Sequence, residues 1–374
     1  MEPRGKTNLL GLTKMQLEDF VEDIGEPAYR AQQIFEWIYT RGVSDINAMS
    51  NLGKSFRSQL ERTCAIHGVE VVAESASPVD GTTKFLFGLA DGKKVESVLI
   101  PPRSSFREAT RSGEEEEQDK LTLCVSTQVG CPLNCAFCAT GTMGFHRNLT
   151  AGEIVSQVLS AKRLTGRTIT NVVFMGMGEP LLNYENVMNA ASIIATGVGI
   201  THKRITVSTA GRPNQIRQMG QEKSRLKLAV SLHSAVDETR TRLMPVNAKY
   251  PLAELMDAIE AYYTSTRQRV TYEFIFFDGV NDTERELRAL VKLARRVPSK
   301  INVIPYHSIA FTQPTGIKAE LRPSLRVEQC VQVLRSHHLT TMVRSNAGED
   351  IDAACGQLAV RLTRLSKRHA PTTT

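Results

Sequence analysis

The sequence predicts an α/β fold: a partial (βα)6 barrel that follows a small helical N-terminal domain and a linking β-hairpin. From Leu121 onward, short apolar runs alternate with helical stretches, a pattern typical of parallel sheets whose strands are connected by helices. About six such units are recognisable where a closed barrel has eight, so we expect the sheet to curl only part of the way round.

The first element is helical and spans residues 1–68. Leu17, Phe20, Val21 and Ile24 recur at the spacing of one helix face, and further helical patterns follow them. We expect these helices to form an accessory domain, because none of them carries residues with obvious chemistry.

The second element, residues 69–120, changes period. Apolar residues flank Asp91-Gly92, a dipeptide that favours a tight hairpin turn between two strands. Glu96 interrupts the second strand, and from the pattern alone it is expected to face solvent. A polar linker that contains four consecutive glutamates, Glu114 to Glu117, completes the segment.

The third element, residues 121–345, is the expected partial barrel, and residues 346–374 form a C-terminal segment. Thr150 and Glu153 match a capping box at the start of the first barrel helix. The expected strands are 121–126, 171–176, 204–209, 226–232, 270–277 and 300–305.

Residues with polar or sulfur-containing side chains gather where these strands end. A cysteine-rich loop follows the first strand, and the turn 176–180 (GMGEP) follows the second. Ser208 ends the third strand, Ser231 and His233 end the fourth, and His307 follows the sixth. Active sites of such barrels lie at the carboxyl ends of the strands, so we expect these residues to share one site.

Composition and charge exclude several classes of protein. With 41% hydrophobic and 23% charged residues, the chain is ordinary for a globular protein, which excludes global disorder. No run approaches the ~18 apolar residues that span a bilayer, and no signal peptide is recognisable, so we expect a cytoplasmic protein without a membrane partner. Nothing indicates an obligate protein partner.

The net charge of +7 favours an anionic partner, nucleic acid first. Six basic residues either meet phosphates or are solvated surface charges: Lys203, Arg204, Arg212, Arg217, Arg240 and Arg242.

Seven cysteines, four of them within fifteen residues, are the most informative feature. Cys131, Cys135 and Cys138 form a C-x3-C-x2-C triplet whose thiolates can converge on one centre. A [4Fe–4S] cluster on these three ligands would keep one iron free for a small molecule. Zinc would need a fourth ligand, for which Cys124 and His146 are candidates. Spacing and position after the first strand favour the cluster.

The triplet, with Phe137 as its aromatic residue, resembles the radical S-adenosylmethionine (SAM) superfamily. The turn at Gly178 and Glu179 is similar to that superfamily's segment for the SAM amino group. Further motifs resemble the RlmN/Cfr family of adenine RNA methyltransferases, and within it the C2-specific, dual-specificity RlmN branch. They are 95–98 (VESV), 124–131 (CVSTQVGC), 176–183 (GMGEPLLN), 231–233 (SLH) and 352–358 (DAACGQL), and the match covers nearly the whole chain.

This resemblance implies a two-stage radical SAM reaction. Cys355 takes a methyl group from one SAM, and a second SAM, reduced at a [4Fe–4S] cluster on the cysteine triplet, yields a radical that takes a hydrogen atom from that methyl group. The resulting methylene radical adds to carbon 2 of adenine. Glu96 is the implied proton acceptor, and Cys124 is the resolving thiol that releases the product and leaves a Cys124–Cys355 disulfide. The scheme implies two SAM molecules per turnover and an external electron donor.

The resemblance also places SAM on the glycine turn and on the ends of later strands. The implied contacts are Gly178, Glu179, Ser208, Ser231, Leu232 and His233. Where the family usually has an asparagine, this chain has His307, whose imidazole can still make one hydrogen bond to SAM.

The implied substrate is RNA, and residues 1–68 are the implied RNA-binding accessory domain. The resemblance points to an adenine in the peptidyl-transferase loop of 23S rRNA and to the purine beside the anticodon of some tRNAs. Such a base has to be unstacked before it can react. Two alternatives stay open: Cfr-like methylation of adenine C8, which shares most of these motifs, and a zinc-stabilised RNA-binding protein without catalysis.

Overall fold

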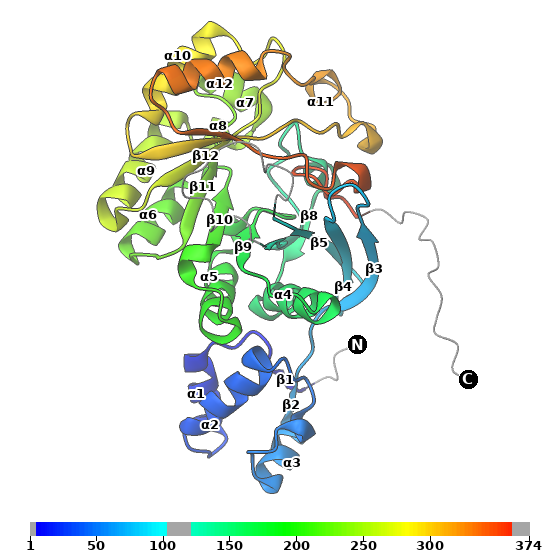
Figure 1. The fold of residues 1–374 in the computed structure, drawn as a ribbon. Coiled ribbons are helices and arrows are strands. Elements are labelled where there is room, and N and C mark those ends of the chain that lie inside the picture. Colours follow the sequence, from blue (N-terminus) through cyan, green and yellow to red (C-terminus); the bar gives the residue numbers. More distant parts are fainter. Residues whose placement is uncertain (1–4, 103–120, 361–374) are drawn as a thin grey trace, which may run out of the picture.

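The computed structural model describes residues 5–102 and 121–360 (Figure 1). Glu114 to Glu117 of the expected linker and the end of the C-terminal segment, residues 361–374, lie outside the described residues. Within the described ranges, no helix combines the length and the apolar character that crossing a membrane requires.

One mixed sheet of ten strands organises the described part of the chain, in the order β14-β13-β12-β11-β10-β9-β6-β5-β4-β3. The six expected barrel strands are present and parallel, which confirms the predicted fold class. β14 pairs with β13 as a further parallel strand that the sequence analysis missed. The parallel strands are β6 (Thr122–Cys124), β9 (Asn171–Phe174), β10 (Ile205–Thr209), β11 (Lys227–Ser231), β12 (Val270–Phe274), β13 (Ser299–Val303) and β14 (Thr341–Val343).

The predicted hairpin is also present, but it does not merely link two domains. Its strands β4 (Thr83–Gly88) and β5 (Lys94–Ile100) continue the barrel sheet, because β5 pairs antiparallel with β6 in the register Val98 to Cys124. β3 (Glu70–Ala76) pairs with β4 and forms the outer edge of the sheet. The hairpin therefore forms one wall of the barrel (Figure 1).

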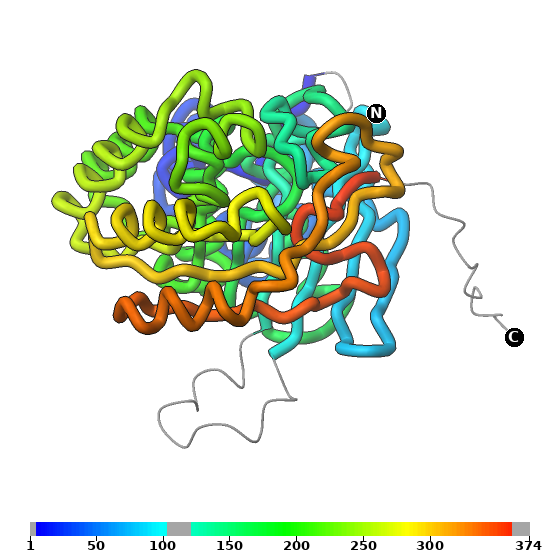
Figure 2. Tube along the Cα trace, turned by 90° about the horizontal axis from the view of Figure 1, so that it is seen from above, coloured from blue at the N-terminus to red at the C-terminus, as the bar shows by residue number. Residues whose placement is uncertain are grey.

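Helices connect the parallel strands and lie outside the curled sheet (Figure 2). The first of them begins with the predicted capping box, in which the Thr150 hydroxyl accepts from the Glu153 amide and the Glu153 carboxylate accepts from the Thr150 amide. These helices are α4 (Ala151–Thr165), α5 (Tyr184–Ile193), α6 (Pro213–Gln221), α7 (Asp237–Leu243), α8 (Val246–Lys249), α9 (Leu252–Thr266), α10 (Glu284–Ala294), α11 (Ile317–Glu320) and α12 (Val327–Ser336).

The N-terminal region is helical, as predicted, and packs against α4 and the end of α5. A Cβ atom on Gly152 of α4 would lie 2.3 Å from the Leu10 carbonyl oxygen, and one on Gly197 would lie 2.6 Å from the Tyr39 Cβ. The two glycines therefore allow the N-terminal region to pack closely against α4 and against the turn that follows α5. The elements of this region are β1 (Thr7–Asn8), α1 (Lys14–Asp23), α2 (Tyr29–Phe35) with the π-turn Glu36–Thr40, a 3-10 turn at Ile46–Ala48, α3 (Lys54–Thr63) and β2 (Cys64–Ala65).

Candidate active site at the carboxyl ends of the barrel strands

The cysteine triplet lies on one loop, residues 131–138, which we call the cysteine loop. A small two-stranded sheet of β7 (Gln128–Gly130) and β8 (Phe145–Asn148) fixes its base. At its centre, the Ala136 amide donates to the Leu243 carbonyl at the end of α7, with an N–O distance of 2.8 Å. The loop is therefore attached both to the first strand of the barrel and to the helix that follows the fourth.

The thiols of this loop sit in a desolvated environment. Burial raises the pKa of Cys131 to about 12, and it raises the pKa of Cys135 well above its usual range. Such thiols bind as thiolates only where a cationic centre replaces their protons. In the part of the chain that the structure describes, no three His, Cys, Asp or Glu side chains lie close enough to share one metal ion. A cluster spreads its thiolates over several irons, so the triplet fits a cluster better than a single ion.

The two candidate fourth ligands for zinc do not join the triplet. Cys124, in β6, is buried and has Cys355 and Arg344 as its electrostatic neighbours. His146 lies exposed on β8. The four-cysteine zinc site of the non-catalytic alternative is therefore not formed.

The turn after β9 places a buried carboxylate beside the cysteine loop. Gly178 has a φ of +102°, and a Cβ atom on it would lie 2.5 Å from the Gln128 side chain, so packing against β7 requires glycine there. The Glu179 carboxylate accepts hydrogen bonds from the backbone amides of Leu181 (3.1 Å) and Ala210 (2.8 Å). Burial raises the pKa of Glu179. A ligand ammonium is the partner that would favour the charged form of this carboxylate.

The ends of β10 and β11 bring Ser208, Ser231 and Leu232 to the same edge of the sheet, since the two strands are paired neighbours. His233 follows in the left-handed region with a φ of +52°, and its Nδ1 accepts from the Ile275 amide at 3.1 Å. Burial lowers the pKa of His233 to about 3, so the ring is neutral. Phe137 packs edge-on against this ring, with 4.4 Å between ring centroids, and joins His233 to the cysteine loop.

The interpretation of Arg240 from the sequence is wrong. This residue is neither a phosphate contact nor a surface charge. Its side chain is fully buried. The guanidinium donates to the carbonyls of Ala210 (2.6 Å), Ser231 (3.2 Å) and Leu232 (3.1 Å), and to the Asn247 side chain (2.8 Å). It therefore holds the ends of β10 and β11, where the SAM contacts are expected, in a fixed relation to α7.

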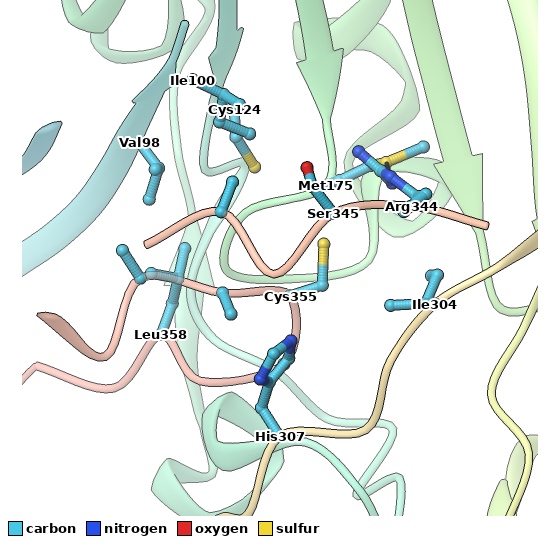
Figure 3. Close-up of a pocket in the computed structure, with 14 residues that line it drawn as sticks. Val98, Ile100, Cys124, Met175, Ile304, His307, Arg344, Ser345, Cys355 and Leu358 are labelled. Carbon is cyan, nitrogen blue, oxygen red and sulfur yellow. Dashed lines mark hydrogen bonds between the residues drawn. The ribbon is translucent and has the colours of Figure 1, made fainter. Parts of the chain in front are cut away.

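A second group of residues surrounds a cavity of about 50 Å³ at the same edge of the sheet (Figure 3). The sulfur atoms of Cys124 and Cys355 both point into it. Cys355 lies in a turn and not in a helix. All seven cysteines carry free thiols, so the Cys124–Cys355 disulfide implied as a reaction product is not formed in this structure. The other lining residues are Val98, Ile100, Met175, Ile304, His307, Arg344, Ser345, Ala347, Ala353, Ala354, Gly356 and Leu358.

Arg344, which directly follows β14, is a site residue that the sequence analysis did not name. Its guanidinium acts electrostatically on both Cys355 and Cys124. Cys355 raises the pKa of Arg344 most, and Glu273, whose carboxylate lies 3.7 Å from the guanidinium, and Cys124 raise it further. Burial raises the pKa of Cys124 to about 12, against the opposing effect of Arg344. A cation beside a thiol favours the thiolate. Recognition of β14 in the sequence would have placed Arg344 at a strand end, where it could have been found.

Glu96 does not face solvent, contrary to the expectation from its strand pattern. β5 lies inside the sheet between β4 and β6, and the Glu96 side chain is only 5% exposed. It points to the same face of β5 as Val98 and Ile100, which line the cavity, because side chains alternate along a strand. Its Oε1 lies 3.5 Å from Lys84 Nζ, while its Oε2 is buried without a hydrogen-bond partner.

The chain from 346 to 358, which we call the C-terminal loop (red in Figure 2), supplies one wall of the cavity. The Gly356 carbonyl accepts from the Ala139 amide at 2.7 Å, and the Leu358 carbonyl accepts from the Thr140 hydroxyl at 2.6 Å. These bonds hold Cys355 next to the cysteine loop. His307 is buried at the cavity wall, and its Nδ1 lies 3.4 Å from the Glu349 carboxylate of the C-terminal loop.

Comparisons with known proteins identify the family of this chain. Residues 7–66 match the family model described as the ribosomal RNA large subunit methyltransferase N-terminal domain, and residues 125–291 match that of the radical SAM superfamily. A probable dual-specificity RNA methyltransferase RlmN from Salinibacter ruber is 42% identical over 95% of this chain and 94% of the relative. The dual-specificity RNA methyltransferase RlmN from Syntrophobacter fumaroxidans is 44% identical over 92% of this chain and 96% of the relative.

A solved structure extends the likeness to the fold. The crystal structure of a radical SAM methyltransferase from Sphaerobacter thermophilus superposes with a TM-score of 0.82 at 40% identity, and the match covers 94% of this chain and 99% of that one. All three relatives are 40–44% identical to this chain over nearly its full length. The chain belongs to the RlmN family of dual-specificity RNA methyltransferases, within the radical SAM superfamily.

Proposed function

We propose that this protein methylates carbon 2 of adenine in 23S rRNA and in tRNA, and that Cys355 carries the methyl group as S-methylcysteine. One observation supports the proposal above the others: two thiols from distant parts of the chain, Cys124 and Cys355, open into one cavity beside the cysteine loop. A superfamily enzyme that only generated a radical would have no use for this pair of sulfurs in addition to the cysteine triplet.

Membership of the radical SAM superfamily implies a [4Fe–4S] cluster and SAM as cofactors. In the proposal, Cys131, Cys135 and Cys138 hold the cluster. SAM contacts the backbone at Gly178, the Glu179 carboxylate and the strand ends at Ser208 and at 231–233, with His307 as a further contact. When bound, these cofactors supply a one-electron cleavage that generates a carbon radical. Two SAM molecules are used per turnover, one as methyl donor and one as radical source.

Side chains of the protein carry out the remaining steps of the proposed reaction. Cys355 accepts the methyl carbon on its sulfur, and the Arg344 guanidinium lines the same cavity. Glu96 accepts the proton from the ring carbon of adenine through its unpaired carboxylate oxygen. Cys124 then attacks the Cys355 sulfur: the S–S bond forms, the bond from that sulfur to the methylene carbon breaks, and this carbon takes up a proton to become the methyl group of the product. The two sulfurs are left as a disulfide, so an external electron donor has to reduce the protein again.

RNA recognition and domain roles are part of the same proposal. The similar proteins are named dual-specificity RNA methyltransferases, and the family that residues 7–66 match is named for methylation of the large-subunit ribosomal RNA. We assign RNA binding to the accessory domain 1–68, support of the site to 69–120, radical chemistry to the barrel 121–345 and methyl transfer to the segment 346–374. Substrates of these kinds are found in the cytoplasm, where we expect the protein to act.

Mass spectrometry of RNA tests the proposal directly. The iron-loaded protein, incubated anaerobically with SAM, a reductant and unmodified 23S rRNA or tRNA, should yield 2-methyladenosine. Cys355→Ala should yield none, whereas Cys330→Ala, a matched loss of a buried thiol remote from the cavity, should retain activity. A product methylated at carbon 8 would favour the Cfr-like alternative. The absence of any methylated base from iron- and sulfide-containing protein would refute both.

A further inference from the structure

Lys84 reaches two parts of the site at once. From β4, its Nζ lies 3.5 Å from Glu96 Oε1 and donates a hydrogen bond to the Asp352 carbonyl oxygen at 3.1 Å. Only 18% of the Lys84 side chain is exposed, so the ammonium is largely withdrawn from water. Asp352 lies three residues before Cys355 in the C-terminal loop. One ammonium thus touches both the expected proton acceptor and the loop that carries the methyl-bearing thiol.

The groups around Glu96 determine how readily its carboxylate ionises. Burial raises the pKa of Glu96, and the Lys84 ammonium and the Ala359 backbone amide oppose that rise. The Asp352 carboxylate acts in the same direction as burial, because a second negative charge disfavours ionisation. Lys84 is therefore the cationic side chain that favours ionisation of Glu96, whereas burial and the neighbouring Asp352 carboxylate disfavour it.

We propose that Lys84 is a positioning residue for the methylation reaction: its ammonium pairs with the Glu96 carboxylate so that this group can accept a proton, and it binds the loop that presents Cys355. The inference rests on the proposed function. In the step concerned, the proton leaves the ring carbon of the covalent adduct and binds to Glu96, which becomes a neutral acid. Lys84 is neither donor nor acceptor of the transferred proton.

The loop has a second anchor that does not depend on Lys84. Asp80 Oδ2 accepts a hydrogen bond from the Gly348 amide at 2.9 Å. Gly348 has a φ of +72°, and a Cβ atom on it would lie 2.8 Å from side-chain atoms of both Thr82 and Ala353. The turn before β4 therefore holds the C-terminal loop even when the lysine is replaced, and loss of Lys84 should leave a folded protein.

The test measures how the rate depends on pH in Lys84→Met and Lys84→Arg, with the iron-loaded protein, SAM and RNA in single-turnover reactions. In the wild type, the rate of base methylation falls on the acidic side as Glu96 becomes protonated. In Lys84→Met, we expect this acidic limb to move to higher pH by about one unit, which lowers the rate about tenfold on that limb and far less at alkaline pH. The covalent protein–RNA adduct should accumulate at low pH. Lys84→Arg restores the cation and should return the limb toward its original position.

A purely structural role for Lys84 would lower the rate equally at every pH. A uniform fall, an unchanged profile in Lys84→Met, or a failure of Lys84→Arg to move the limb back would each overturn the inference. Lys84→Gln is a second neutral variant should methionine disturb the packing, and the same shift is expected. Lys93→Met, in the turn of the same hairpin, is the matched control and should leave the profile unchanged.

Failure of this inference is distinguishable from failure of the proposed function. Mass spectrometry of the protein reports S-methylation of Cys355, and analysis of the RNA reports the wild-type product. A wild type that methylates no base refutes the proposed function. A wild type that turns over normally beside a Lys84→Met variant with the same pH profile refutes only the role of Lys84.

Discussion

Replacing Arg240 with methionine should destabilise the protein far more than the same change at Arg242, although both lie on α7 and look alike in the sequence. Arg240 is fully buried, whereas Arg242 is exposed. Methionine keeps much of the volume of the side chain but donates no hydrogen bonds. The change therefore isolates the loss of the guanidinium from the loss of packing.

The structure gives the size of the effect. Two buried acceptors lose their donor in Arg240→Met: the Ala210 carbonyl and the amide oxygen of Asn247. The Leu232 carbonyl keeps a hydrogen bond from the Ser234 amide at 2.7 Å. The Ser231 carbonyl belongs to a half-buried residue and can be hydrated instead. A buried acceptor without a partner costs about 1 kcal/mol at the low end of measured values, so the variant should lose about 2 kcal/mol of unfolding free energy. Arg242→Met should stay within about 0.5 kcal/mol of the wild type.

Urea unfolding followed by circular dichroism provides the measurement, under reducing conditions and on matched samples of the three proteins. Binding of SAM to the folded variant is a second measurement, because the freed carbonyls lie at the strand ends where SAM is expected. Equal stabilities of Arg240→Met and Arg242→Met would contradict the reasoning, since they would mean that water or neighbouring donors replace the guanidinium at no cost.

Three further predictions concern the thiols, the accessory domain and the pH dependence of stability. Cys124→Ala should trap a covalent protein–RNA adduct that denaturing gels detect, and normal turnover by this variant would refute its resolving role. Gly152→Val should detach the N-terminal helices, because a Cβ atom there meets the Leu10 carbonyl at 2.3 Å; limited proteolysis should then cleave this region faster, but not in Gly53→Ala, where a Cβ atom meets nothing. The pKa of His233 is about 3 in the folded protein and ~6.5 when unfolded, so the unfolded chain binds the extra proton between these values. Stability should therefore fall as the pH drops from 6.5 toward 3, by up to about 1.4 kcal/mol per unit, and His233→Asn should flatten this dependence in urea titrations. A variant with the same slope as the wild type would show that other groups cause it.

The sequence predicted the order of the barrel strands and the residues at their ends because both are local properties. Apolar runs mark strands, and turn residues such as those at 176–180 mark where each strand stops. Parallel pairing then brings successive strand ends to one edge, so Ser208, Ser231 and the cysteine loop could be assigned to one site without any knowledge of distances.

The charged residues inside the protein could not be predicted in this way. Glu96 and Arg240 have neighbours in the sequence that suit a solvent-facing strand and a surface helix, and only the pairing of β5 with β6 and the packing of α7 bury them. Arg344 follows a strand of three residues, two of them exposed, which leaves almost no apolar signal in the sequence. Burial of a charge depends on contacts between distant segments, which periodicity does not contain.

The bond between the Thr140 hydroxyl and the Leu358 carbonyl spans 218 residues of chain. During synthesis, the first half of the barrel emerges long before the residues that cover its cysteine loop. A nascent chain can therefore fold the loop early, yet it cannot bring the Cys355 sulfur to that loop until the C-terminal loop has been synthesised. Chains that end before Cys355 would keep the barrel strands but lack the second sulfur of the cavity.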